Sequence, residues 1–147
     1  MFDASLIIPI FNEDKNIKLL FNQLLEYEVY KKINVILFVN DCSTDKSLSK
    51  INEISKKYPK VKVITNNKNM GQSYSIYTGA KYLSDDTLIT IDGDCQNNPK
   101  DIFKLLQIYF SMSEIFLVGG IRTYRRDNYI KRISSIIANQ IRKKILQ

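Results

Sequence analysis

The chain has 147 residues, of which 44% are hydrophobic and 25% charged, and this composition predicts a single globular domain with a core of its own. It contains no histidine, which excludes histidine-based catalytic triads, histidine zinc sites and histidine general bases. The net charge of +7 lies in residues 122–147, because residues 1–121 carry 14 basic and 14 acidic side chains. A neutral body with a basic end predicts a local anionic partner and argues against a general nucleic-acid-binding protein.

Export and membrane-spanning signals are missing from the sequence. No apolar run reaches 18 residues, and the N-terminus lacks a basic region and carries Asp3, which argues against a signal peptide. Cys42 and Cys95 have no metal-ligand spacing and fall in separate loops, so we expect free thiols in a reducing compartment. These features predict a cytoplasmic protein.

The N-terminal part alternates between apolar runs and amphipathic segments. Residues 4–10 predict a buried strand that stops at Pro9. Residues 11–27 have apolar side chains at i, i+3 and i+4 and predict a helix with Asn12 as its N-cap. The continuous apolar run 33–39 is typical of a parallel strand covered on both faces.

The same alternation continues along the chain. The polar loop 40–47 opens a second helix, and residues 61–65 predict a third strand. A turn ending in glycine precedes a helix over about 72–83, and residues 86–91 predict a fourth strand.

Two further elements complete the order. Pro99 suits the first turn of another helix, with Asn98 as its cap, and the apolar run 114–120 predicts a fifth strand. The alternation predicts an α/β fold, namely a doubly wound, mostly parallel sheet with helices on both faces. Such sheets bind ligands beyond the carboxyl ends of their strands, which is where the polar loops of this chain lie.

The stretch LITIDGDCQNNPKDI, residues 88–102, places two aspartates directly after the fourth strand. If the strand continues through them, Asp92 and Asp94 point to the same side. With the side-chain oxygen of Gln96 they form a set of oxygen ligands suited to Mg²⁺ or Mn²⁺. The alternative is that one aspartate caps the next helix, although Asn98 is better placed for that role.

Four segments occur in order along the chain: IIPIFNED at the first strand, VNDCSTDKS at the second, NNKNMGQSYSIYTG after the third and IDGDCQNNPKDI at the fourth. Together they resemble the family 2 glycosyltransferases, which have the Rossmann-like GT-A fold. Among these they are most similar to the polyprenyl-phosphate sugar synthases of the dolichol-phosphate-mannose synthase type. The resemblance implies a metal-dependent, inverting enzyme that moves a sugar from a nucleoside-diphosphate sugar to a polyprenyl phosphate.

The resemblance also implies roles for the polar residues of these segments. The residues that would contact the nucleotide sugar are Pro9, Phe11, Glu13, Asn40, Asp41, Asn69, Gly71 and Asp92. Asp92, Asp94 and Gln96 would hold Mg²⁺ or Mn²⁺ with the diphosphate, and Asp94 would be a catalytic residue.

Some positions leave alternatives open. Asn40 stands where the family pattern has an aspartate, so the preferred base is undetermined, and Cys42 replaces the usual glycine of its loop. Phe11 suits core packing as well as a pocket, and Glu13 suits the first turn of a helix.

Residues 122–147 predict a basic amphipathic helix, because isoleucines recur at spacings of three or four among lysines and arginines. Such a helix can lie on an anionic bilayer at the inner face of the cell membrane; an ordinary packed helix with a solvated basic face is the alternative. The resemblance places Arg122, Lys131 and Ser135 near the acceptor phosphate, with Arg132 as an alternative to Lys131. It makes Arg122 a second catalytic residue.

The sequence thus predicts a nucleotide-sugar-binding core at 1–121 and a basic segment near acceptor and membrane at 122–147, within one domain. Chains of the resembled family continue further, often into transmembrane helices, so the resemblance implies C-terminal truncation. A saccharide acceptor and a non-catalytic nucleotide-binding module stay open as alternatives. The sugar, the base and the oligomeric state, a homo-oligomer included, are undetermined.

Overall fold

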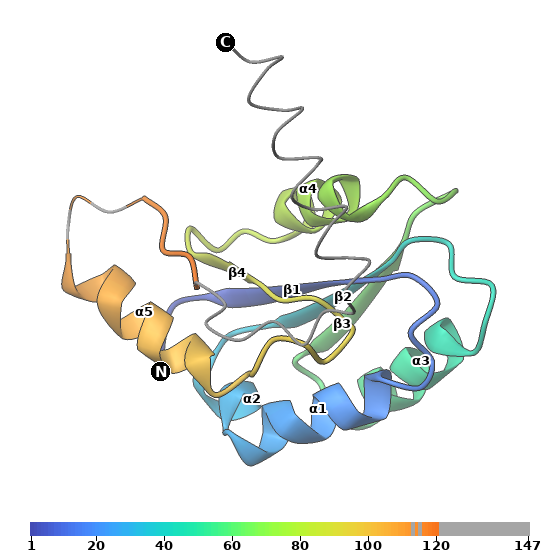
Figure 1. The fold of residues 1–147 in the computed structure, drawn as a ribbon, viewed down its shortest axis with the longest axis horizontal. Helices are drawn as coiled ribbons and strands as arrows, with labels where there is room; N and C mark the ends of the chain where they lie inside the picture. Colours follow the sequence, from blue (N-terminus) through green and yellow to red (C-terminus); the bar gives the residue numbers. More distant parts are fainter. Residues whose placement is uncertain (113, 115, 121–147) are drawn as a thin grey trace, which may run out of the picture.

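The computed structural model describes residues 1–112, 114 and 116–120 (Figure 1). Within them the chain forms a parallel four-stranded sheet with the order β3-β2-β1-β4. The strands are β1 (Ser5–Ile10), β2 (Ile36–Asn40), β3 (Val61–Thr65) and β4 (Leu88–Thr90). The helices are α1 (Ile17–Glu26), α2 (Val29–Lys32), α3 (Ser47–Lys57), α4 (Gln72–Tyr82) and α5 (Asp101–Ser111).

Helices cover both faces of the sheet, with α4 on one side and α1, α2 and α3 on the other (Figure 1). The alternation of side chains along β1 supplies a core to each face. Leu6 and Ile8 belong to the larger core, which includes buried residues of α1, α3 and α5. Ile7 packs with Leu37 and Val39 on the α4 side. The predicted doubly wound α/β fold is confirmed.

The close packing of α4 on the sheet depends on Gly79. A Cβ atom at this position would lie 2.8 Å from Cγ2 of Ile7 and 3.2 Å from Cγ2 of Val39. Because no side chain intervenes, α4 approaches β1 and β2 closely. Its first residue, Gln72, bonds to Asp92 in the loop after β4.

The predicted fifth strand at 114–120 is wrong for its described residues. Residues 116–120 form no strand, and the side chains of Phe116 and Leu117 are 94% and 87% exposed. Apolar composition favours a strand only where a neighbouring strand offers hydrogen bonds, and residues 116–120 have no such partner within the described part of the chain.

The boundaries around the first loop also differ from the prediction. β1 continues past Pro9, because on its β2 edge the carbonyl of Ile10 accepts the N–H of Asp41 at 2.7 Å. Asn12 does not cap α1, which begins at Ile17. Asn12 instead has a φ of 55°, in the left-handed region, and lies four residues before Asn16, the N-cap position of α1.

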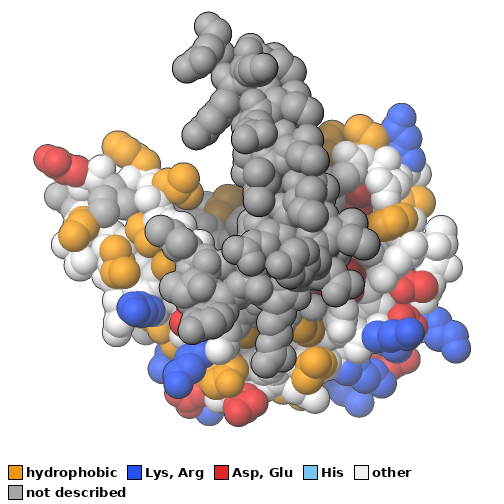
Figure 2. All heavy atoms as spheres, viewed as in Figure 1, with side chains coloured by type: hydrophobic (Ala, Val, Ile, Leu, Met, Phe, Trp, Pro, Cys, Tyr) orange, Lys and Arg blue, Asp and Glu red, His pale blue; other side chains and the backbone are white. Residues whose placement is uncertain are grey.

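Charged side chains of both signs are interspersed over α1 and α3, while hydrophobic ones gather over α5 (Figure 2). Lys18 of α1 pairs with Glu53 of α3 at 3.7 Å, with both side chains more than half exposed. The mixed charge agrees with the neutral balance of residues 1–121.

Candidate functional site

A cavity of about 440 Å³ lies beyond the carboxyl ends of β1 and β4. It is lined by Pro9, Ile10, Phe11, Glu13, Asp41, Asn69, Gly71, Gln72, Ser75, Asp92, Gly93 and Asp94. The strand order changes direction between β1 and β4, since β2 and β3 lie on the other side of β1. Open parallel α/β sheets bind ligands at this switch point.

Pro9 separates the two strands at this point. Ser5 N–H donates to the carbonyl of Thr87 at 3.1 Å, and the carbonyl of Ile7 accepts the N–H of Ile91 at 3.3 Å. The next residue of β1 on this edge is Pro9, which has no N–H to donate. The ladder therefore ends, and the chain after β4 leaves the sheet at the cavity.

Gly93 lets the loop after β4 turn closely against β1. A Cβ atom on Gly93 would lie 2.4 Å from Cδ1 of Ile10 and 3.2 Å from the carbonyl oxygen of Pro9. The expectation that Asp92 and Asp94 share a face through a continuing strand is wrong, because β4 ends at Thr90. This loop, rather than a strand, brings both carboxylates to the cavity wall.

The two aspartates are held differently. Asp92 Oδ1 accepts the side-chain amide of Gln72 at 2.6 Å, which links the loop after β4 to the first residue of α4. Asp94 Oδ1 accepts the N–H of Gln96 at 3.0 Å. The predicted cap role of Asn98 is wrong, because α5 begins at Asp101 with Lys100 at its N-cap and no side-chain cap. Asn98 Oδ1 instead accepts the N–H of Lys100 at 3.0 Å, in the turn before the helix.

Asp41, which follows β2, is a buried acidic residue that also lines the cavity. Its carboxylate accepts the side-chain amide of Asn66 at 2.7 Å, the N–H of Met70 at 3.0 Å and the N–H of Gly71 at 2.7 Å. Burial alone would raise the pKa of Asp41, but the hydrogen bonds from Asn66, from these two N–H groups and from Ser75 hold it below its ordinary value. An ionised carboxylate thus fixes the turn after β3, where Gly71 has a φ of 87°.

The loop after β1 contributes Phe11 and Glu13. Phe11 is 46% exposed and lines the cavity, so core packing does not explain it. Glu13 precedes α1 and is not in its first turn. Its Oε2 accepts the side-chain amide of Asn16 at 2.6 Å.

Most residues that the resemblance singled out lie at the cavity. Asn40 and Gln96 do not line it. Asn40 is 1% exposed, and its Oδ1 accepts the N–H of Ser43 at 3.2 Å, so it shapes the loop after β2. The acceptor-side residues Arg122, Lys131, Arg132 and Ser135 lie outside the described residues.

Sequence reasoning missed four lining residues: Ile10, Gln72, Ser75 and Gly93. The sequence could have indicated Gln72, because this residue directly follows Gly71, the glycine that ends the turn after β3. Its hydrogen bond to Asp92 joins residues 20 positions apart, which no local pattern reveals.

The two cysteines are free, as expected. Cys42 has a φ of 58°, so it adopts the backbone conformation that the usual glycine would favour, at some cost in strain. Burial, followed by the charges of Asp94 and Glu13, raises the pKa of the Cys95 thiol, which argues against a thiolate nucleophile.

Comparison with known proteins places nearly all of the chain in one protein family. The glycosyl transferase family 2 model matches residues 5–147. The dolichol-phosphate mannosyltransferase of Pyrococcus furiosus is 37% identical over 118 residues, which are 76% of this chain and 31% of that protein. The undecaprenyl-phosphate 4-deoxy-4-formamido-L-arabinose transferase of Pectobacterium carotovorum is 28% identical over 142 residues, 95% of this chain and 42% of that protein. The chain thus spans less than half the length of these relatives.

The fold has solved counterparts. The mannosyltransferase PcManGT from Pyrobaculum calidifontis, solved in complex with GDP-Man and Mn²⁺, superposes with a TM-score of 0.60 at 17% identity. The match covers 69% of this chain and 30% of that one. The likeness shows a shared GT-A fold.

Proposed function

The chain belongs to the family 2 glycosyltransferases, and from that membership we propose that its cavity binds a nucleoside-diphosphate sugar for transfer to a polyprenyl phosphate. The cavity carries this proposal, because it lies at the switch point of the sheet and carboxylates line it. A polyprenyl-phosphate acceptor is supported by the two relatives whose names specify dolichol and undecaprenyl phosphates. Residues 1–121 would form the donor-binding core and residues 122–147 the acceptor and membrane side.

The carboxylates of the loop after β4 fit a divalent cation. Asp92 and Asp94 both line the cavity, and Oδ2 of Asp94 accepts no hydrogen bond from the described part of the chain. Among the described residues no group of three or more acidic, cysteine or histidine side chains could hold an ion alone, so diphosphate oxygens and water would complete the ligand set. Bound Mg²⁺ or Mn²⁺ would offset the charge that develops on the departing diphosphate.

The acceptor proposal follows from the chemistry of the nucleophile. A sugar hydroxyl needs a general base, and the chain has no histidine. Its cavity carboxylates hold the loops, would bind the cation or, in the case of Glu13, would contact the nucleotide. A phosphate monoester is already ionised near neutral pH. Its oxygen would attack the anomeric carbon as the bond to the diphosphate breaks, so the sugar configuration inverts. Arg122, with Lys131 or Arg132 and Ser135, would position that phosphate.

We expect the complete protein to transfer a labelled sugar to polyprenyl phosphate and not to an oligosaccharide. Arg122→Ala should depress turnover and leave the donor affinity nearly unchanged, because this arginine is assigned to the acceptor. Lys104→Ala, in the exposed part of α5, is the matched control and should keep full turnover. Efficient transfer to an oligosaccharide, with none to the lipid phosphate, would contradict the proposed acceptor.

We further propose peripheral attachment to the inner face of the cell membrane through residues 122–147. Among the described residues, none of the helices combines the length and apolar character needed to cross a bilayer. The excess of basic residues in 122–147 would provide electrostatic attraction instead.

We expect the protein to float with anionic liposomes in low salt and to lose this binding as salt rises. Each basic residue near an anionic surface contributes on the order of 1 kcal/mol, so replacing Arg142, Lys143 and Lys144 by glutamine should release much of the protein. Replacing the exposed Lys56 and Lys57 of α3 is the control and should have little effect. Equal flotation of both variants would show that the C-terminal segment is not the anchor.

A further inference from the structure

The segment 11–14 carries two cavity-lining side chains, yet it belongs to no helix or strand. It connects the end of β1 to the turn before α1. Phe11 and Glu13 project from it into the cavity wall. What holds this segment therefore decides the shape of that wall.

Three successive backbone N–H groups of the segment are each accepted by a side-chain oxygen of residues 43–47. The bonds are Asn12 N–H to Ser43 Oγ at 3.1 Å, Glu13 N–H to Ser47 Oγ at 2.9 Å and Asp14 N–H to Asp45 Oδ2 at 3.1 Å. In return, Thr44 N–H donates to Asn12 Oδ1 at 2.8 Å. Residues 43–47 thus supply the hydrogen-bond partners that a strand or helix would otherwise provide.

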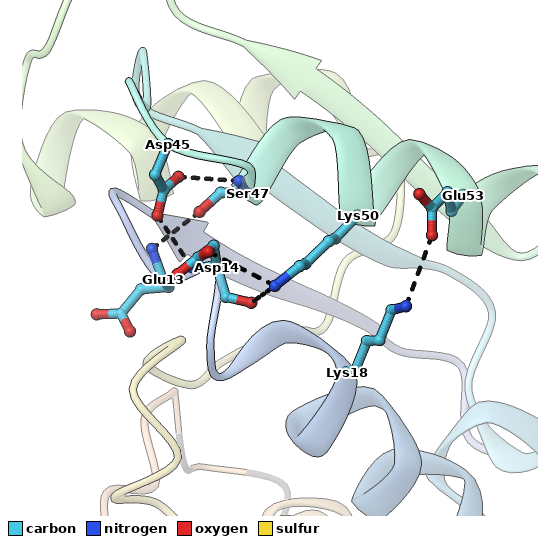
Figure 3. A network of polar contacts seen from close by, with 7 residues as sticks. All are labelled: Glu13, Asp14, Lys18, Asp45, Ser47, Lys50 and Glu53. Carbon is cyan, nitrogen blue, oxygen red and sulfur yellow. Dashed lines mark hydrogen bonds and ion pairs between the residues drawn. The ribbon is translucent and has the colours of Figure 1, made fainter.

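Asp45 and Ser47 join this contact to α3 (Figure 3). Asp45 Oδ1 accepts the N–H of Ser47, the first residue of α3, at 2.8 Å, while its Oδ2 accepts the N–H of Asp14. Burial opposes ionisation of Asp45, but hydrogen bonds from the hydroxyl and N–H of Ser47 and from Asp14 N–H lower its pKa below the ordinary value. Its bonds are therefore charge-assisted, which makes them stronger than neutral ones.

The same contact leaves the Glu13 side chain facing away. In Figure 3 the Glu13 carboxylate points away from Ser47 and Lys50, while its N–H points at Ser47. Lys50 secures the following residue, since its ammonium donates to the carbonyl of Asp14 and pairs with its carboxylate at 3.6 Å. Ser47 is fully buried and is not part of the cavity wall.

We infer that Asp45 and Ser47 are positioning residues of the donor site, which hold Glu13 at the cavity through the backbone of residues 12–14. The inference rests on the proposed function, because it assigns these residues an effect on nucleotide-sugar affinity. Neither residue lines the cavity in which the donor would bind. Most of their effect should therefore be lost when the Glu13 side chain is removed.

The test is a double-mutant cycle read by calorimetry with GDP-mannose and UDP-GlcNAc as probes. Ser47→Ala should raise the dissociation constant of the tighter probe about tenfold, because Glu13 N–H loses its acceptor. In a Glu13→Ala background the same change should raise it less than threefold. Ser55→Ala removes a hydroxyl elsewhere in α3 that bonds to Asn52, and it should leave affinity unchanged. If Ser47→Ala does not fold, Asp45→Asn gives the same comparison with Glu53→Gln as its control.

The outcomes separate the two proposals. If the wild-type protein binds neither probe, a UDP-, GDP- or CDP-sugar selected by thermal shift with Mn²⁺ replaces them in the cycle. If it binds none of these sugars, the proposed function fails, and this inference fails with it. If the wild-type protein binds and Ser47→Ala binds equally well, only the positioning role is overturned. Equal losses in the two backgrounds would show that Ser47 affects donor affinity independently of Glu13, which also overturns the positioning role.

Discussion

Asp41→Asn is expected to destabilise the protein by about 1–3 kcal/mol, the cost of leaving buried donors without an acceptor. The carboxylate receives three N–H groups, from Asn66, Met70 and Gly71, and a carboxamide offers a single oxygen in place of two. The two backbone N–H groups cannot reorient without moving the turn. Urea unfolding at neutral pH measures the loss.

Asp86→Asn is the control, because Asp86 is exposed, and the free energy of unfolding of this variant should stay within about 0.5 kcal/mol of wild type.

The pH dependence of the free energy of unfolding gives a second check. The pKa of Asp41 is lowered in the folded protein, so its contribution is complete above the ordinary aspartate pKa of 3.8 and is lost as pH falls through the native value. The difference between wild type and Asp41→Asn should thus shrink in acid below about pH 4. A constant difference, or none at neutral pH, would show that the carboxylate does not stabilise the turn.

Asp94→Asn is expected to weaken cation-dependent binding of a nucleotide sugar at least tenfold, which corresponds to about 1.4 kcal/mol. The substitution removes one of the two carboxylates that the loop after β4 presents to the cavity. The carboxamide keeps an oxygen for the N–H of Gln96, so the loop should keep its conformation. A thermal-shift panel of UDP-, GDP- and CDP-sugars with and without Mn²⁺ selects the donor, and calorimetry with that donor gives the affinity.

The expected loss is confined to binding in the presence of Mn²⁺. Without the cation, wild type and Asp94→Asn should bind the donor with similar, low affinity. Asp101→Asn, at the start of α5 and outside the cavity, should behave as wild type in both conditions. Equal affinities of Asp94→Asn and wild type with Mn²⁺ present would remove Asp94 from the cation site.

The sequence by itself determined the order of β1 to β4 and the helices α1, α3 and α4 between them, but it did not indicate the short helix α2. Apolar runs such as 33–39 and helical spacings such as those of α1 are local patterns, because burial repeats with the period of the element that forms. It also indicated the four loops that surround the cavity, since the carboxyl ends of parallel strands meet at one edge of a sheet. The predicted fifth strand failed because a strand needs a neighbour as well as apolar residues.

Only the tertiary structure decided how the loops meet. Pro9 interrupts the hydrogen bonds between β1 and β4 only because the register brings it to that edge. The bonds of Asp41 to Gly71, of Gln72 to Asp92 and of Ser47 to Glu13 join residues 20 to 34 positions apart. A hydrogen bond depends on the distance and direction of two groups in space, and sequence spacing determines these only within one element. For that reason the sequence located the site, while the tertiary structure decided which of its residues face the cavity and which hold those residues in place.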